Sequence, residues 1–436
     1  MKILRYPSNA AEKKMRSIIA RDIDFRKADV QAVTRILNDV KRNGDEALIR
    51  YCQAFDAPGM TIETLAVTPE EMAAARTKVD RAFLKALNRA VAQIDGFHRQ
   101  QLPKSWIDTR RPGTLLGQMV HPVDAAGVYV PGGKGGNTPL VSSVLMGAIP
   151  AKIAGVPKVV MVTPPMPSGE VAPHLLVAAK KVGVDAVYKV GSAWAIGALA
   201  YGTETLPKVN VVVGPGNIFV TLAKKIVAGT VGIDMIAGPS EILIVADGTA
   251  DPEYIAADLL SQAEHDPLAS AILVTDSAEL AQAVKAAVEI QLAALSRVDI
   301  ARQSLSAFGA IMVVENVDVA IGLANHIAPE HLELQVAEPM DVAPRIRNAG
   351  AIFLGPYTPE PVGDYMAGPN HVLPTAGTAR FSSALSVDHF MKKTSLIRYS
   401  RAALRKEARD IISLATVEGL GAHASAIRIR LKKKAK

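Results

Sequence analysis

The sequence predicts an α/β fold that contains two parallel-sheet units in succession. Short apolar segments typical of buried strands alternate with segments of helical spacing over residues 159–227, and the alternation returns over residues 241–326. Such alternation indicates right-handed βαβ units whose crossover helices cover a parallel sheet. Apolar residues make up 49% of the 436 positions and charged residues 21%. This composition predicts a well-folded chain of roughly two to four domains.

The first hundred residues are predicted to be mainly helical. Residues 1–24 are expected to form a polar arm with one short helix. The apolar spacing indicates helices over residues 28–55, with a break at Asn43-Gly44, and over residues 69–100. This part carries little visible chemistry and is interpreted as scaffold.

The first α/β unit contains two glycine-rich loops, each after a predicted strand. They are Pro131–Gly136, after a strand at 127–130, and Gly214–Asn217, after a strand at 209–213. Glycine lets a backbone approach a ligand closely, and ligands of parallel sheets bind at the carboxyl ends of strands. A plain surface loop is the alternative, and the Gly-x-Gly-x-x-Gly fingerprint is missing from both loops, so a nucleotide would need an atypical loop. The other expected elements are strands at 115–121, 159–163 and 186–190 and helices at 174–182, 193–201 and 219–227.

The second α/β unit contains an adjacent glutamate and histidine, Glu330 and His331. They follow a predicted helix at a turn that Pro329 imposes, because proline disfavours helix in the residue before it. Neighbours on an extended backbone point to opposite faces, so a carboxylate and an imidazole could serve one proton-transfer site. Chance adjacency is the alternative interpretation. The expected elements of this unit are strands at 241–246, 271–275, 310–314 and 351–354 and helices at 252–264, 278–292 and 317–326.

Possible metal ligands lie in the same half of the chain. Gln262 and His265 are three residues apart near a predicted helix end, so they share a face and could meet one ion. A solvated surface pair is the alternative. A glycine- and proline-rich loop, Gly363–Pro374, holds one carboxylate and one imidazole, and loops of this kind often carry function. Six of the nine histidines follow residue 264.

Cysteine usage and charge exclude several classes of protein. The one cysteine, Cys52, excludes disulfide frameworks and thiolate metal sites, which fits a reducing cytoplasm and leaves nitrogen and oxygen donors for any metal. The net charge is +7, with a basic segment at 428–436 that could touch nucleic acid or lipid but is more typical of a solvated end. Neither a signal peptide nor a membrane span is expected, since the apolar region 141–162 is interrupted by lysines and prolines.

Taken together, these segments resemble the histidinol dehydrogenase family over nearly the whole chain. The motifs that carry the resemblance are Gly44–Ala47, Tyr129–Gly133, Gly214–Asn217, Gly238–Glu241, Ser261–Asp266, Ala328–Glu333, Gly363–Pro374, Thr378–Ser383 and Ala422–Arg430. Their joint occurrence in this order is specific. The resemblance implies four-electron oxidation of L-histidinol through L-histidinal to L-histidine, with two NAD consumed and one Zn²⁺ per subunit.

The resemblance also implies roles for residues of this sequence. His331 is expected to be the general base of the alcohol step and Glu330 to activate water for the aldehyde step. The expected zinc ligands are Gln262, His265, Asp364 and, from the partner chain, His423. The expected substrate contacts are Ser240, Gln262, His265, His331, Asp364, His371, Glu418 and His423, and the expected cofactor contacts are Tyr129 and Asn217.

The family fold, carried over, implies a homodimer with shared active sites in the cytoplasm, with no nucleic-acid or membrane partner. It implies two Rossmann-like parallel-sheet domains with incomplete nucleotide-binding topology, plus small helical terminal pieces. The expected division is an arm at 1–24, a first α/β domain at 25–128 and 240–384 that carries zinc and catalytic residues, a cofactor-side α/β domain at 129–239, and a C-terminal helical domain at 385–436 that reaches the partner.

Two positions depart from the family pattern. Trp194 stands where a cofactor-contacting glutamine is usual, and an indole N–H accepts no hydrogen bond, which puts the cofactor pose there in question. The loop Gly132–Pro139 is about three residues longer than a common form and is expected to alter the lid over the cofactor.

Three other interpretations remain at this point. A related enzyme could use the same zinc and NAD on another polar alcohol, such as a sulfonated diol. The basic segment at 428–436 could bind nucleic acid, although no interleaved aromatic residues support this. The histidines could also be ordinary polar loop residues.

Overall fold

A computed structural model describes residues 1–21, 25–132 and 138–432 of the chain. The chain separates into two compact units. The first contains Met1–Gln101 and Val123–Phe390, and the second contains Leu102–Pro122 and Met391–Lys436. The first unit holds two parallel sheets and the second holds an antiparallel sheet with two helices. The predicted α/β class with two parallel-sheet units is confirmed.

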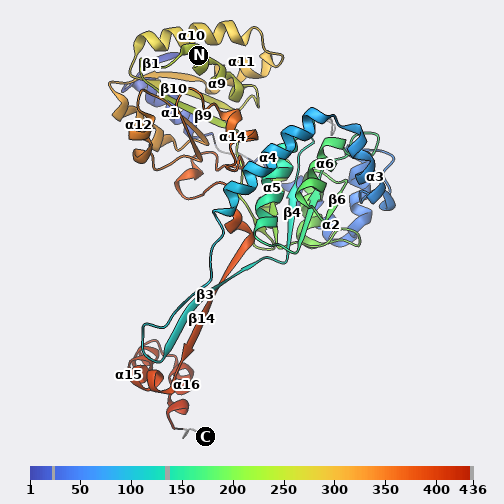
Figure 1. The fold of residues 1–436 in the computed structure, drawn as a ribbon, viewed down its shortest axis with the longest axis vertical. Helices are drawn as coiled ribbons and strands as arrows, with labels where there is room; N and C mark the ends of the chain where they lie inside the picture. The colour runs from blue at the N-terminus through green and yellow to red at the C-terminus, as the bar shows by residue number, and fades with distance from the viewer. Residues whose placement is uncertain (22–24, 133–137, 433–436) are drawn as a thin grey trace. The chain divides into compact units, whose positions relative to one another are not determined.

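The larger sheet has six strands, all parallel, in the order β1-β11-β10-β9-β12-β13. The strands are β1 (Ile3–Arg5), β9 (Glu241–Ala246), β10 (Ser270–Thr275), β11 (Ala310–Val313), β12 (His331–Gln335) and β13 (Ala351–Leu354). Helices cover both faces (Figure 1). They are α1 (Asn9–Ile19), α9 (Pro252–Ala263), α10 (Ala278–Leu292), α11 (Val298–Phe308), α12 (Val317–Ile327), α13 (Pro339–Val342) and α14 (Glu360–Tyr365).

Alternation along β9 shows how the apolar sequence builds this layered core. Ile242 and Ile244 pack with α9 and α10, whereas Leu243 and Val245 pack with α1 and α12 on the opposite face. Successive strand residues point to opposite faces, so a strand that is covered on both sides is apolar throughout. All six residues of β9 are buried.

The smaller parallel sheet has five strands in the order β6-β5-β4-β7-β8. The strands are β4 (Ala125–Tyr129), β5 (Lys158–Val162), β6 (Ala186–Tyr188), β7 (Val211–Val213) and β8 (Gly232–Ile233). The helices of this half are α2 (Lys27–Phe55), α3 (Pro69–Ala74), α4 (Arg81–Arg99), α5 (Val141–Ile153), α6 (Pro173–Val182), α7 (Ser192–Tyr201) and α8 (Ile218–Val227). Gly44 has non-helical backbone angles inside α2, which confirms the predicted break there.

Packing of α2 bears on the expected domain division. Val33, Leu37 and Leu48 share one core with strands of the five-stranded sheet and with α7 and α8. The expected division instead groups residues 25–128 with residues 240–384. Both parallel sheets fall within one compact unit, so the division of the chain does not separate the two expected α/β domains. The expected boundaries therefore remain a prediction. The packing of α2, and of α3 and α4 against α6 and α5, favours placing residues 27–99 with the five-stranded sheet.

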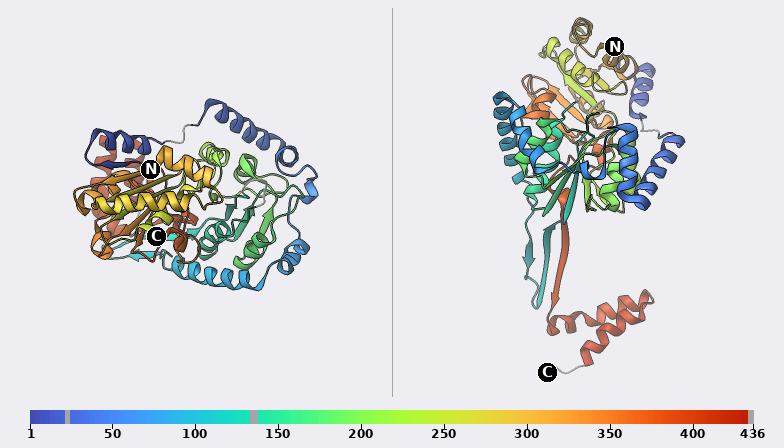
Figure 2. Two further views of the ribbon diagram at one scale, coloured as in Figure 1. Left: turned by 90° about the horizontal axis from the view of Figure 1, so that it is seen from above. Right: turned by 90° about the vertical axis from the view of Figure 1, so that its right-hand side faces the viewer.

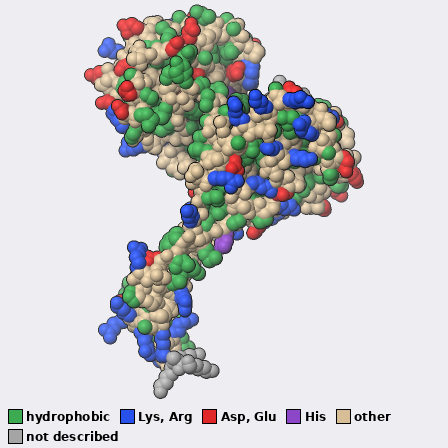
Figure 3. All heavy atoms as spheres, viewed as in Figure 1, with side chains coloured by type: hydrophobic (Ala, Val, Ile, Leu, Met, Phe, Trp, Pro, Cys, Tyr) green, Lys and Arg blue, Asp and Glu red, His purple; other side chains and the backbone are tan. Residues whose placement is uncertain are grey.

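The second unit is built on an antiparallel sheet of order β14-β3-β2. Its elements are β2 (Trp106–Asp108), β3 (Thr114–Pro122), β14 (Met391–Tyr399), α15 (Arg401–Val417) and α16 (Gly421–Lys432). The two helices follow one another at the C-terminal end of the chain (Figure 2). Exposed arginines and lysines gather on them (Figure 3). The piece expected to be helical at 385–436 therefore contains a nine-residue strand, β14, before its two helices.

Candidate active site

The predicted turn at Ala328–Pro329 places Glu330 and His331 at the start of a strand. Helix α12 ends at Ile327, Ala328 adopts a left-handed conformation with φ of 54°, and β12 begins at His331. Left-handed backbone costs a residue with a Cβ about 1–2 kcal/mol. Together with Ala328, Ser192 and Ala376 are the non-glycine residues of positive φ in the described chain. Backbone strain of this kind clusters at functional sites.

Glycine at position 350 lets β13 approach this turn closely. A Cβ atom at Gly350 would lie 2.5 Å from the Glu330 carbonyl oxygen, closer than real side chains come. The amide of Gly350 donates to the Pro329 carbonyl at 2.9 Å, and the amide of Ala351 donates to the Glu330 carbonyl at 2.9 Å. The backbone of Glu330 is therefore held from the β13 side.

Glu330 and His331 are both held by the first residue of the neighbouring strand β9, Glu241. The Glu241 amide donates to Glu330 Oε2 at 2.9 Å, and His331 Nδ1 lies 2.9 Å from the Glu241 carbonyl oxygen. A carbonyl oxygen only accepts, so Nδ1 carries the proton and Nε2 keeps a free lone pair. Both side chains are buried, at 10% exposure for Glu330 and 5% for His331.

His331 Nε2 faces a buried carboxylate that the sequence analysis missed. Glu360, at the start of α14, lies with its Oε1 atom 3.9 Å from His331 Nε2 and 4.0 Å from His265 Nε2. Its other oxygen accepts from Ser261 Oγ at 3.1 Å. His331, Glu360 and Asp364 each offer a ligand atom, and these atoms all lie within 4.8 Å of one another. Glu360 stands four residues before Asp364, a spacing that places both on one helix face and that could have revealed it.

Burial and mutual repulsion shift the pKa of these groups. Burial, with the charges of Glu241, Glu360 and Asp364, raises the pKa of Glu330 well above its usual range. Burial, then the Glu360 charge, raises the pKa of Asp364 to about 7. Burial lowers the pKa of His331 and lowers that of His371 to about 4. Carboxylates packed this closely are stabilised by a cation between them.

Gln262 provides an independent sign that a ligand belongs here. Its side chain is fully buried at the end of α9, and neither amide atom has a hydrogen-bond partner in the described chain. An unsatisfied buried polar group costs about 1–3 kcal/mol, so such a group in a folded protein calls for a partner. A metal ion bound through the amide oxygen would supply one, and imidazole and carboxylate donors stand nearby. The residues present fit a zinc ion held by nitrogen and oxygen.

The expected site residues fall into three groups. Glu330, His331 and Asp364 come together around the unexpected Glu360, and His371 Nδ1 lies 3.9 Å from Asp364 Oδ1. His265 reaches Glu360, although about half of its side chain is exposed. Ser240 and His265 line a cavity of about 470 Å³ together with Asn217. Glu418 and His423 belong to the second unit, where both are exposed.

The cofactor-side residues follow the strands at the switch point of the five-stranded sheet. Tyr129 ends β4, and Asn217 caps α8 after β7, with Asn217 Oδ1 accepting from the amides of Phe219 and Val220. Ligands of open parallel sheets bind where the strand order reverses, here between β4 and β7. Gly214 is required in between, since a Cβ there would lie 2.1 Å from the Tyr129 carbonyl oxygen.

Trp194, the departure from the expected glutamine, belongs to the core of this half. It is 5% exposed and stacks with Tyr51 and with Phe55, each ring centroid lying 5.6 Å from that of the indole. Tyr129 lies near the same helix, since its hydroxyl accepts from the Ser192 amide at 3.1 Å. The longer loop expected at 132–139 falls largely on positions 133–137, which lie outside the described residues.

Comparison with known proteins agrees with this geometry. The family model for histidinol dehydrogenase matches residues 20–431. The chain belongs to the histidinol dehydrogenase family. It is 58% identical to the histidinol dehydrogenase of Desulfotalea psychrophila, over 92% of each chain, and 52% identical to that of Syntrophotalea carbinolica, over 99% of each. A solved histidinol dehydrogenase from Elizabethkingia anophelis superposes with a TM-score of 0.93 at 37% identity, over 99% of this chain and 98% of that one.

Membership of this family establishes the class of enzyme. Histidinol dehydrogenases are NAD-dependent, zinc-binding oxidoreductases of the last steps of histidine biosynthesis, so the expected enzyme class and cofactors are confirmed. In the described part of the chain, no helix combines the length and apolarity that crossing a membrane requires.

Proposed function

We propose that this chain oxidises L-histidinol through L-histidinal to L-histidine and uses Glu330 and His331 for proton transfer. The observation that carries this proposal is the buried pair itself, anchored to the Glu241 backbone beside Glu360 and Asp364. The burial of the pair excludes bulk water, and proton transfer by positioned side chains contributes about 10²–10⁴-fold to rate.

His331 takes the alcohol proton at Nε2. Its Nδ1 proton is committed to the Glu241 carbonyl, and burial lowers its pKa, so the imidazole is neutral and able to accept near pH 7. Bound NAD would supply the acceptor for the hydride that leaves the same carbon. The tautomer is thus set by the backbone and not by substrate.

Glu330 activates the water that attacks the aldehyde stage. Its raised pKa makes the ionised carboxylate a stronger base than an exposed glutamate, and its Oε2 atom is oriented by the Glu241 amide. Zinc, held by Gln262, His265, Asp364 and the partner subunit's His423, would supply a fixed point for the substrate's imidazole and amino nitrogens. Ser240, His371 and Glu418 are proposed to contact the substrate, and Tyr129 and Asn217 the cofactor.

A homodimer with shared active sites is part of the proposal. Glu418 and His423 are exposed on the second unit, and the same unit exposes large apolar side chains that a partner would cover. They are Trp106, Ile107, Ile397, Leu414 and Val417, each more than half exposed. A cytoplasmic location, and the absence of nucleic-acid or membrane partners, are also part of the proposal, because the family resemblance implies them.

The deciding experiment is the amount of NADH formed per L-histidinol consumed, before and after treatment with a chelator. We expect two NADH per substrate, with activity lost on chelation and restored by Zn²⁺. One NADH per substrate would contradict the role of Glu330 in the aldehyde step. Turnover of a sulfonated diol and none of histidinol would contradict the substrate.

A further inference from the structure

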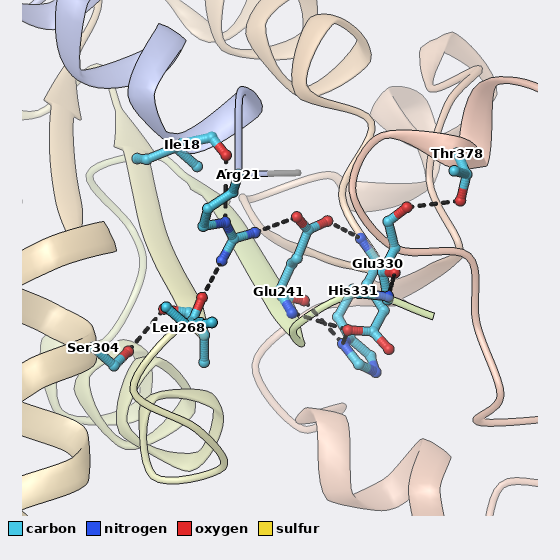
Figure 4. A network of polar contacts seen from close by, with 11 residues as sticks. Ile18, Arg21, Glu241, Leu268, Ser304, Glu330, His331 and Thr378 are labelled. Carbon is cyan, nitrogen blue, oxygen red and sulfur yellow. Dashed lines mark hydrogen bonds and ion pairs between the residues drawn. The ribbon is translucent and has the colours of Figure 1, made fainter. Parts of the chain in front are cut away.

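A buried ion pair lies behind the proposed catalytic residues and ties them to the N-terminal arm. Arg21, just after α1, forms an ion pair through Nη2 with Glu241 Oε1, and the two side chains are only 5% and 7% exposed. The guanidinium is fixed on its other edges as well. Nε donates to the Ile18 carbonyl at 3.3 Å and Nη1 donates to the Leu268 carbonyl at 2.6 Å (Figure 4).

Glu241 is the point from which both proposed catalytic side chains are held. Its amide donates to Glu330 Oε2 at 2.9 Å, and its own Oε2 accepts from the Glu330 amide at 3.3 Å, which closes a reciprocal pair. Its carbonyl accepts from His331 Nδ1 at 2.9 Å. One residue thus uses its amide, its carbonyl and its carboxylate to orient a carboxylate and an imidazole (Figure 4).

We propose that Arg21 and Glu241 are positioning residues for Glu330 and His331. The inference rests on the proposed function, because it assigns these residues no contact with substrate. Arg21 holds the Glu241 carboxylate turned toward the Glu330 amide. Without the guanidinium, a buried carboxylate would lose its ion-pair partner, which is costly, so it would turn away or take up a proton. The Glu330 amide would then lose its acceptor.

Two interpretations of the same contacts give different kinetics. If the pair only attached the arm to the sheet, its loss would lower stability and leave the kinetics of the surviving folded enzyme unchanged. If it orients the catalytic residues, its loss lowers kcat while KM for histidinol and NAD stays near its original value. A displacement of about 1 Å at reacting groups costs on the order of 10²-fold in rate.

The test uses Arg21→Met and Arg21→Lys in the full-length, zinc-loaded enzyme. Arg26→Met is the matched control, because Arg26 is 79% exposed and pairs with Asp29 on the same stretch of chain. We expect kcat of Arg21→Met to fall roughly 10- to 100-fold with each KM within about twofold. Arg21→Lys, which keeps the charge, should recover much of the loss, and Arg26→Met should match the original enzyme.

A second measurement does not depend on activity. Hydrogen exchange of the peptides that contain Glu241 and Glu330 should become faster in Arg21→Met and stay unchanged in Arg26→Met. If the original enzyme does not oxidise histidinol, the proposed function fails. The exchange result still tests whether Arg21 and Glu241 hold the backbone of Glu330 in place. If Arg21→Met does not fold, Glu241→Gln replaces it, since this change keeps shape and an acceptor oxygen but removes the charge.

Each outcome decides the inference. A fall in kcat at constant KM, recovered by Arg21→Lys and accompanied by faster exchange, supports it. An unchanged kcat in folded Arg21→Met, or equal effects of Arg21→Lys and Arg21→Met, overturns it.

Discussion

The two parallel sheets of the first unit place their proposed functional residues at opposite edges. In the five-stranded sheet, Tyr129 and Asn217 stand at or just beyond the carboxyl ends of β4 and β7. In the six-stranded sheet, Glu241 and His331 are the first residues of β9 and β12, at the amino ends of those strands. The usual rule that ligands bind at carboxyl ends therefore describes only one half of this molecule.

Helix dipoles explain what each edge is suited to bind. In a βα unit, the helix begins at the carboxyl edge and ends at the amino edge. The carboxyl edge thus collects positive helix N-termini, such as that of α8 behind Asn217, which suit phosphate groups. The amino edge collects negative helix C-termini, such as that of α9 beside Gln262, which suit a cation. The edge that a sheet presents selects the charge of its ligand.

Each half also holds its functional loop with one buried ion pair, but the pairs act on different groups. Arg21 and Glu241 are proposed to orient the side chains of Glu330 and His331. Lys224 and Asp234 form an ion pair with side chains 3% and 0% exposed and grip the backbone of Gly214. Lys224 Nζ donates to the Gly214 carbonyl at 3.0 Å, and Asp234 Oδ2 accepts from the Gly214 amide at 2.8 Å. We propose that the first pair supports proton transfer and that the second supports cofactor binding.

The largest expected effect comes from removing the base in the six-stranded half. His331→Asn should lower kcat for histidinol by about 10²–10⁴-fold, because it removes the buried imidazole whose tautomer the Glu241 carbonyl fixes. Binding of NAD, measured by titration calorimetry, should be unchanged, since Asn217 and its loop lie in the other half. The exposed His326→Asn is the control and should behave as the original enzyme. If NAD binding by His331→Asn fell as much as its kcat, the division of catalysis and cofactor binding between the two halves would be wrong.

Much of the fold and part of the site could be predicted from the sequence. Apolar runs predict β9, β10, β11 and β13, because strands covered on both faces are largely apolar throughout, and the helix predicted at 317–326 matches α12 to one residue. The turn that presents Glu330 follows from Pro329 alone. Strand β1 was not predicted, because its three residues are too few to show a periodic pattern. Helix α11 was not predicted, although its sequence is amphipathic. Strand β14 lies in a segment that was expected to be helical.

The positioning residues were beyond sequence reasoning for a physical reason. Arg21 and Glu241 are 220 positions apart, and nothing in local spacing pairs them. Glu360 could have been found from its spacing to Asp364, but its approach to His331 depends on how α14 returns to the sheet. The resemblance to a family supplied roles for single residues, whereas the hydrogen bonds that orient them became visible only in three dimensions.

A smaller effect is expected from the ion pair of the five-stranded half. The double variant K224M/D234N removes the charges together and so leaves no lone buried charge. We expect KM for NAD to rise roughly 10-fold, about 1.4 kcal/mol of binding free energy, with kcat at saturating NAD within about threefold. Lys225→Met, at the exposed neighbouring position, should leave both constants unchanged. If K224M/D234N lowered kcat as much as Arg21→Met does, the two ion pairs would not have the separate roles proposed for them.

The smallest expected effect concerns Asp56, a carboxyl group of the five-stranded half for which the described residues supply no ion-pair partner. Within that part of the chain its Oδ2 atom is buried without a hydrogen bond, and burial raises its pKa to about 7. The unfolded chain has a pKa near 3.9 for this group, so the folded state binds the proton more tightly. The stability that protonated Asp56 allows is therefore complete below about pH 4 and is lost as pH rises toward 7. Asp56→Asn removes this loss.

Urea unfolding of Asp56→Asn at pH 5 and pH 8 checks the sign. We expect the variant to exceed the original protein in stability by on the order of 1–3 kcal/mol at pH 8, and by less at pH 5. Asp185→Asn is an opposite control, because Asp185 Oδ2 accepts from Lys152 Nζ and from the Val159 amide, both at 2.7 Å, and its loss should destabilise. An equal effect of Asp56→Asn at both pH values would mean that the carboxylate finds a cation in solution. Asp56 would then be paired with a cation, as Glu241 is with Arg21 in the six-stranded half.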